Sequence, residues 1–202
     1  MTTPIAYTKI KIISLALVCI GKGPINSIAD AGTFAEAAGD IYDLLYPSLL
    51  TNGSWRFAVK IQELSQNITD PIIDSWSYSW QLPADYLELI RLDPFIDYNI
   101  FGKNIYTKTT ATNLYAIYYY QPLESVLPPY FVRHFVYQLA ADMAWGLARD
   151  KNLSKVYEQK ANEALMIGQV ADARSHPNSA IFNAPYINVR KGNGRRLYRG
   201  YQ

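Results

Sequence analysis

The spacing of apolar residues changes twice along this chain, and that change limits the folds available to it. Apolar residues recur every three or four positions over about residues 8–52 and 129–175, as they do in amphipathic helices. Between about residues 54 and 121 they alternate with polar residues, as in half-buried strands. The sequence therefore predicts an α+β fold, in which a four-helix bundle carries a β-strand region inserted between helices two and three, plus an extended C-terminal arm.

End signals place the first two helices. The first is expected over about residues 8–20, because Gly21 accepts the left-handed conformation that ends a helix. The second opens with a capping box of Thr33 and Glu36 and closes at Asn52-Gly53. Its buried face is expected to hold Ala37, Ala38, Ile41, Leu44 and Leu45.

Proline and serine give the remaining helix signals. We expect Pro47 to kink or nearly end the second helix, because proline cannot continue the hydrogen-bond ladder. Pro128 and Pro129 suit the first turn of a third helix over about residues 130–149. Its core stripe is expected to be Phe131, Phe135, Leu139, Met143 and Leu147. Ser154 is expected to cap a fourth helix that reaches about Ala173.

The central region has the alternation and turn residues of several strands. The first expected strand has Trp55, Phe57, Val59 and Ile61 on one face. Further strands are expected at about 78–82, 86–92 and 114–120, with a hairpin over about 99–107 that turns at Gly102.

Charge separates the last part of the chain from the rest. No acidic residue follows Asp172, whereas six of the 19 Lys and Arg residues lie in residues 173–202. Residues 177–202 also lack any apolar period, so we expect an extended basic arm that is mobile alone and ordered against a partner. The candidate partner contacts are the apolar Ile181, Phe182, Tyr186 and Ile187 and the following Arg190, Lys191, Arg195, Arg196, Tyr198 and Arg199.

The sequence contains no complete catalytic constellation. Gly21-Lys22-Gly23 lacks the flanking residues of a phosphate-binding loop, and a chain with one Cys and two His has few metal ligands. His134 lies beside aromatic residues in the third helix and is expected to be a core or interface histidine. A glycosidase needs only two carboxylates, but the candidates Asp85, Glu88, Asp93 and Asp97 are better explained as turn and solvent-facing strand residues. We therefore expect no enzyme, and assign no catalytic, cofactor-binding or metal residue.

The N-terminal segment imitates a signal peptide. Lys9 and Lys11 precede an apolar run, but no small-residue cleavage site follows it, and the run is too short to span a bilayer. We expect a core helix in which Cys19 is a buried small apolar residue, and we expect no membrane partner.

Two binding functions stay open from the residues alone. Residues 190–199, with Tyr198 and the nearby Tyr201, could hold phosphates and stack on bases, which would make the chain a nucleic-acid-binding module. The 17 tyrosines could instead belong to a carbohydrate-binding module or to protein interfaces.

The order of short motifs resembles a known family. The motifs are, in chain order, Ala16-Leu17-Val18-Cys19-Ile20-Gly21-Lys22-Gly23-Pro24-Ile25-Asn26-Ser27-Ile28, Leu49-Leu50, Trp55-Arg56-Phe57-Ala58, Tyr78-Ser79-Trp80-Gln81-Leu82-Pro83-Ala84-Asp85, the turn at Gly102, Tyr118, the helix start at Pro128–Tyr130, Leu139-Ala140-Ala141 and Leu147-Ala148. Over about residues 8–175, this pattern resembles the head-to-tail adaptors of short-tailed bacteriophages, called tail tubular protein A or head completion proteins.

The resemblance implies a structural virion protein without a cofactor or a reaction. It implies an adaptor domain at residues 1–176 that assembles as a ring, a dodecamer, beneath the portal protein. The tail nozzle or tube would attach below, and genomic DNA would pass through the lumen without sequence recognition. Such a protein assembles in the bacterial host cytoplasm and resides in the neck of the virion.

Overall fold

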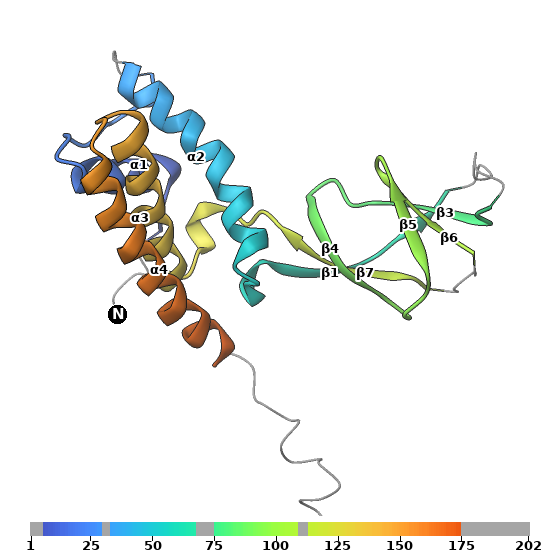
Figure 1. The fold of residues 1–202 in the computed structure, drawn as a ribbon. Coiled ribbons are helices and arrows are strands. Elements are labelled where there is room, and N and C mark those ends of the chain that lie inside the picture. Colours follow the sequence, from blue (N-terminus) through green and yellow to red (C-terminus); the bar gives the residue numbers. More distant parts are fainter. Residues whose placement is uncertain (1–5, 30–32, 68–74, 109–112, 175–202) are drawn as a thin grey trace, which may run out of the picture.

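A computed structural model describes residues 6–29, 33–67, 75–108 and 113–174, in which four helices combine with two antiparallel sheets (Figure 1). The helices are α1 (Lys9–Cys19), α2 (Thr33–Asn52), α3 (Pro129–Gly146) and α4 (Lys151–Ala173). The strands are β1 (Val59–Glu63), β2 (Ser65–Gln66), β3 (Tyr78–Gln81), β4 (Tyr86–Asp93), β5 (Tyr98–Phe101), β6 (Asn104–Thr107) and β7 (Tyr115–Tyr120). Short 3-10 helices, η1 (Arg56–Ala58) and η2 (Glu124–Val126), precede β1 and α3. The predicted mixture of helices and strands is confirmed.

Helix α3 lies at the centre of the helical part, where it packs against α1, α2 and α4. The predicted stripe of α3 is confirmed, because Phe131, Phe135, Leu139 and Met143 are fully buried, while Leu147 is half-buried. The aromatic rings of α2 complete this core, and the ring centroids of Tyr46 and Phe135 lie 5.3 Å apart.

The predicted buried face of α2 is partly wrong. Leu44 is 79% exposed, whereas Tyr42 and Tyr46 take the core positions. The hydroxyl of Tyr46 donates a 2.6 Å hydrogen bond to the carbonyl of Pro122. A tyrosine ring can be buried when its hydroxyl finds such a partner, so the tyrosines displaced the leucine from the core face. Helix α2 continues past Pro47 and ends at Asn52, the position that the sequence predicted for its end.

The helix ends show which capping signals operate. Thr8 caps α1. Gly21 follows that helix with a φ of +74°, as the sequence predicted. For α4 the expected cap was wrong: Asp150, rather than Ser154, accepts hydrogen bonds of 3.0 Å from the amides of Asn152 and Leu153. Because Asp150 accepts hydrogen bonds from the backbone amides of the first turn, the helix begins at Lys151 and Ser154 lies inside it. Cys19 is half-buried against the helical core rather than fully buried.

The strands form two small sheets beyond the end of α2 (Figure 1). One has the order β1-β7-β4 and the other β2-β3-β6-β5, and all pairs are antiparallel. The two sheets share a second core of Leu64, Trp80, Leu82, Leu92, Ile105, Leu114, Ala116 and Tyr118. The predicted hairpin at Gly102 is confirmed, with β5 and β6 on either side.

The first predicted strand is only half right. Residues Arg56–Ala58 form a 3-10 turn, and β1 begins at Val59. Trp55 is fully buried in the helical core, whereas Ile61 is 65% exposed at the other end of the same alternating pattern. The alternation therefore spans a junction between the helical core and the sheet rather than one continuous strand.

Candidate interaction surface

A contiguous apolar patch lies on the last turns of α4. Met166, Ile167 and Val170 are exposed there, and together we call them the α4 stripe. With Ala171 and Arg174 they line a shallow groove of about 410 Å³. Single exposed apolar residues, such as Phe95 after β4, are ordinary on protein surfaces, whereas a contiguous group indicates a binding surface.

The outward face of α4 changes character along its length. In the first turns, its exposed positions are mostly polar, as at Lys155, Gln159 and Asn162, and Val156 is an isolated apolar exception. The same line of the helix continues at helical spacing into Met166 and Val170, which are exposed and apolar. If the whole outward face of α4 were in contact with water, polar residues would be expected along its full length. The apolar residues on its last two turns are instead typical of a surface that another protein segment covers.

The opposite face of α4 fixes the stripe in place. Its small residues Ala161, Ala164 and Gly168 are buried, and they allow α4 to approach α3 closely. A Cβ atom added to Gly168 would lie 3.0 Å from the indole of Trp55, so this position has little room for a side chain. The stripe is therefore presented on a helix whose rear face is closely packed.

Asp172 ties the end of α4 to the junction before β1. It is buried, and its carboxylate accepts a 2.7 Å hydrogen bond from the backbone amide of Arg56 and a 2.8 Å bond from the Tyr130 hydroxyl. Burial, and then the hydrogen bond and negative charge of Asp172, raise the pKa of Tyr130 well above its usual range. The tyrosine therefore remains a hydrogen-bond donor throughout the neutral range.

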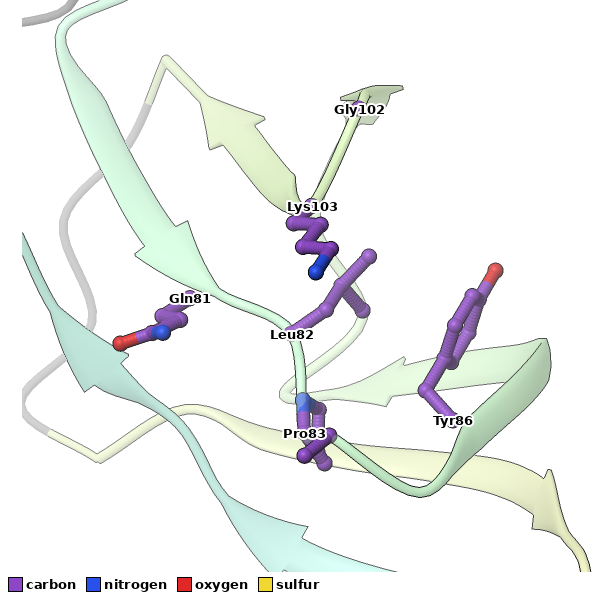
Figure 2. A pocket seen from close by; sticks show the side chains of 7 residues that line it. Gln81, Leu82, Pro83, Tyr86, Gly102 and Lys103 are labelled. Atoms are coloured by element: carbon purple, nitrogen blue, oxygen red, sulfur yellow. The ribbon is translucent and has the colours of Figure 1, made fainter.

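A second hollow lies in the sheet region, between the turn after β3 and the β5–β6 hairpin. It holds about 280 Å³ and is lined by Gln81, Leu82, Pro83, Ala84, Tyr86, Gly102 and Lys103. Figure 2 shows Lys103 beside Leu82, with the ring of Tyr86 on the other side of Leu82. The amide of Leu82 donates a 2.9 Å hydrogen bond to the carbonyl of Lys103, which holds the hairpin against the turn. None of the residues that line this hollow is a carboxylate.

Two of the four carboxylates considered for a glycosidase pair, Asp85 and Glu88, lie in positions that suit a structural role. Asp85 accepts hydrogen bonds of 2.7 Å from Lys60 and 2.9 Å from the Tyr118 hydroxyl. Desolvation acts to raise the pKa of Asp85, but these hydrogen bonds and the charge of Lys60 outweigh it and lower that pKa. A lowered pKa does not suit a general acid. Glu88 is exposed on β4, as expected for the solvent-facing side of a strand.

His134 lies in the core, as the sequence predicted. It is buried, and its Nδ1–H donates a 2.9 Å hydrogen bond to the carbonyl of Ala161. Burial lowers the pKa of His134, and the hydrogen bond to Ala161 offsets part of that shift. In the described ranges, no group of His, Cys, Asp and Glu side chains has the arrangement that would hold a metal ion.

The predicted partner contacts at residues 181–199 lie outside the described residues. The surface that the sequence reasoning missed is the α4 stripe. A signal for it was present, because Met166, Ile167 and Val170 repeat at helical spacing opposite the small residues of α4. From the sequence alone, apolar residues at this spacing are usually interpreted as the buried face of a helix. In α4, however, the face that packs on α3 is the one with the small residues.

None of the helices in the described part of the chain combines the length and apolar character needed to cross a membrane. No known family model matches the sequence, and a search among curated proteins finds no significant match.

Proposed function

We propose that this chain is a structural ring subunit of the head-to-tail connector of a short-tailed bacteriophage. It would join the portal protein above to the tail nozzle or tube below, and the ring would continue the DNA channel. The observation that carries this proposal is the α4 stripe, an exposed apolar group on a helix whose rear face is closely packed. The type of assembly, a ring between portal and tail, is inferred from the order of motifs that resembles the adaptor family.

The arrangement of the helices leaves surfaces on more than one side of α3, which suits a ring. Helices α2 and α4 both pack on α3, and Figure 1 shows them on different sides of the helical part. Contacts between unlike surfaces of neighbouring copies are head-to-tail contacts, and these close into rings when the rotation allows. The dodecamer is the ring size that the family resemblance implies.

We also propose that the four helices form one bundle and that residues 54–121 are an insertion into it. Support comes from the central position of α3, which contacts each of the other three helices. The sheets of the insertion extend away from the helices in Figure 1, which would give the ring a second surface for a partner.

The charge distribution supports a channel rather than a DNA-reading module. Before residue 173 the chain carries 13 of its 19 basic residues and all 17 of its acidic residues. A mildly acidic body does not hold phosphates, so DNA could slide past it. In this proposal the virion is the final location, and the protein needs neither a cofactor nor a reaction.

Co-sedimentation separates this function from a nucleic-acid- or carbohydrate-binding module. The protein is mixed with the portal ring of the same phage, with duplex DNA, or with host surface glycans, each at low and at high salt. We expect binding to the portal that persists at high salt, because apolar contacts are insensitive to counterion release. Salt-sensitive DNA binding alone, glycan binding alone, or hydrolytic turnover lost on mutation of one carboxylate would contradict the proposal.

A further inference from the structure

The α4 stripe lies at the point where the described chain ends. The groove lined by Met166, Ile167 and Val170 reaches to Arg174, and residues 175–202 follow. We propose that this groove is the docking site for residues 181–189 of a second copy of the chain. The inference rests on the proposed ring, because it makes the C-terminal segment a link between neighbouring subunits.

The composition of residues 181–189 fits the groove. This segment holds the apolar Ile181, Phe182, Tyr186, Ile187 and Val189, and it precedes the basic residues 190–199. Short apolar segments bind shallow grooves through a few anchoring side chains. Phosphate binding by the basic residues would not require these anchors, so the apolar segment needs a protein surface of its own.

Charge favours a second copy over the segment's own helix. A chain that turned back after Arg174 would run along α4 towards its N-terminus. Nine extended residues span about 30 Å, which equals roughly 20 residues of helix. With residue 181 placed beside Arg174, Arg190 and Lys191 would then lie at the first turns of α4. The cations there, Lys151, Lys155 and Lys160, outnumber the acids, Asp150 and Glu158, so the net interaction is repulsive. A segment from a neighbouring copy can cross the stripe in another direction and avoid this contact.

Disulfide exchange between two full-length proteins tests the proposal. In a Cys19→Ser background, one protein carries Ala171→Cys beside the stripe and the other carries Ala184→Cys. Both substitutions leave the proposed apolar contacts in place. The Cys at 184 is first activated as a mixed disulfide with nitrothiobenzoate. Attack by the thiolate at 171 forms the protein–protein disulfide and expels nitrothiobenzoate, whose absorbance gives the rate.

The matched controls lie on the same helix. Gln159→Cys places the thiol on the polar part of α4, about 18 Å from position 171 at 1.5 Å per residue. Rates are divided by each thiol's rate with a small activated disulfide, because the two positions differ in exposure. Ile167→Asp alters the stripe, whereas Val156→Asp alters an exposed aliphatic residue outside it. The reactions are run with the portal ring and, at high protein concentration, without it.

We expect position 171 to react with position 184 about tenfold or more faster than position 159 does, because docking raises the effective concentration. Ile167→Asp should abolish this preference and Val156→Asp should retain it. Equal normalised rates at 171 and 159, or a preference insensitive to Ile167→Asp, would overturn the docking site. In a dilute double variant, Ala171→Cys with Ala184→Cys, the short tether alone brings the two thiols together. An intrachain disulfide whose rate of formation is strongly reduced by Ile167→Asp would therefore overturn the assignment to a second copy.

Portal binding of the same samples separates this inference from the proposed function. If the protein sediments with the portal and shows no preference for position 171, the docking inference fails and the connector proposal stands. If the preference is present and the protein does not bind the portal, the docking site stands and the connector proposal fails.

Discussion

The carboxylate of Asp172, near the end of α4, accepts a 2.7 Å hydrogen bond from the backbone amide of Arg56, which lies 116 positions earlier in the chain. The same carboxylate accepts a bond from Tyr130 of α3. One side chain thus joins α4, α3 and the start of the sheet region, and it fixes the part of α4 that carries the stripe.

Replacement of Asp172 by Ala should lower the free energy of unfolding by about 2 kcal/mol, because it leaves partly buried donors without this acceptor. Tyr130→Phe should cost about 1 kcal/mol, since it removes one of these hydrogen bonds. Glu163→Ala, at an exposed position of the same helix, is the control and should change little. Urea unfolding of the variants measures these differences, and an Asp172→Ala curve that matches the control would refute the role given to Asp172.

Leu139→Ala should cost about 2–5 kcal/mol, because Leu139 is fully buried in α3 and its truncation leaves a cavity. Leu44→Ala removes the same atoms from a residue that is 79% exposed, so it should change the free energy of unfolding by less than about 0.5 kcal/mol. Thermal and urea unfolding of the pair give the comparison. Equal losses would mean that the face of α2 has been assigned wrongly.

Gly53→Ala should destabilise the fold by about 1–3 kcal/mol, because a Cβ atom there would collide with the indole of Trp55. The indole would have to move and would lose its 2.9 Å hydrogen bond to the carbonyl of Leu49. Gly146→Ala is the matched control, since its added Cβ meets only Ile41 at 4.0 Å. That variant should be neutral or slightly more stable. Urea unfolding of the two variants gives the comparison, and equal stabilities would contradict the collision with Trp55.

Two carboxylates should give opposite pH dependences. Burial, together with the charge of Glu158, raises the pKa of Asp142 despite a hydrogen bond from Gln138. The pKa of Asp142 in the folded protein therefore exceeds its ordinary value of 3.8. The protonated Asp142 contributes fully to stability below pH 3.8, and this contribution is lost as the pH rises through the raised pKa. Asp142→Asn should stabilise the protein at about pH 7 and have less effect at about pH 4.

The pKa of Asp85 is lowered, so its contribution is present above 3.8 and is lost as pH falls through the lowered value. Asp85→Asn should therefore slightly destabilise the protein at about pH 7, and only slightly because the group is partly exposed. Unfolding curves of both variants across this range provide the measurement. A stability change of the same sign for both variants at neutral pH would contradict the assignment.

The elements that could be predicted from sequence are those in which local signals and packing agree. The stripe from Phe131 to Met143 and the hairpin at Gly102 are of this kind, because period and turn chemistry point to one structure. The errors lie where tertiary contacts decide between competing signals. Tyr42 and Tyr46 displaced Leu44 because partners for their hydroxyls come from residues about 80 positions away.

The candidate surface was harder to predict than the fold. Sequence reasoning placed the partner contacts in residues 181–199, which lie outside the described residues. For helix four it predicted only the two ends and not which face is exposed. Apolar periodicity alone does not distinguish a buried face from an exposed binding surface. The burial of Ala161, Ala164 and Gly168 resolves this for α4, and it depends on the position of α3, which the sequence does not specify.

The mass of the purified protein, measured by sedimentation alone and in a mixture with the portal ring of the same phage, tests the connector proposal most directly. The account predicts a monomer at micromolar concentration in isolation and a closed ring of this chain bound to the portal in the mixture. A closed ring of the pure protein would contradict only the need for the portal as a template. A protein that stays monomeric and unbound when mixed with the portal would contradict the proposed function itself.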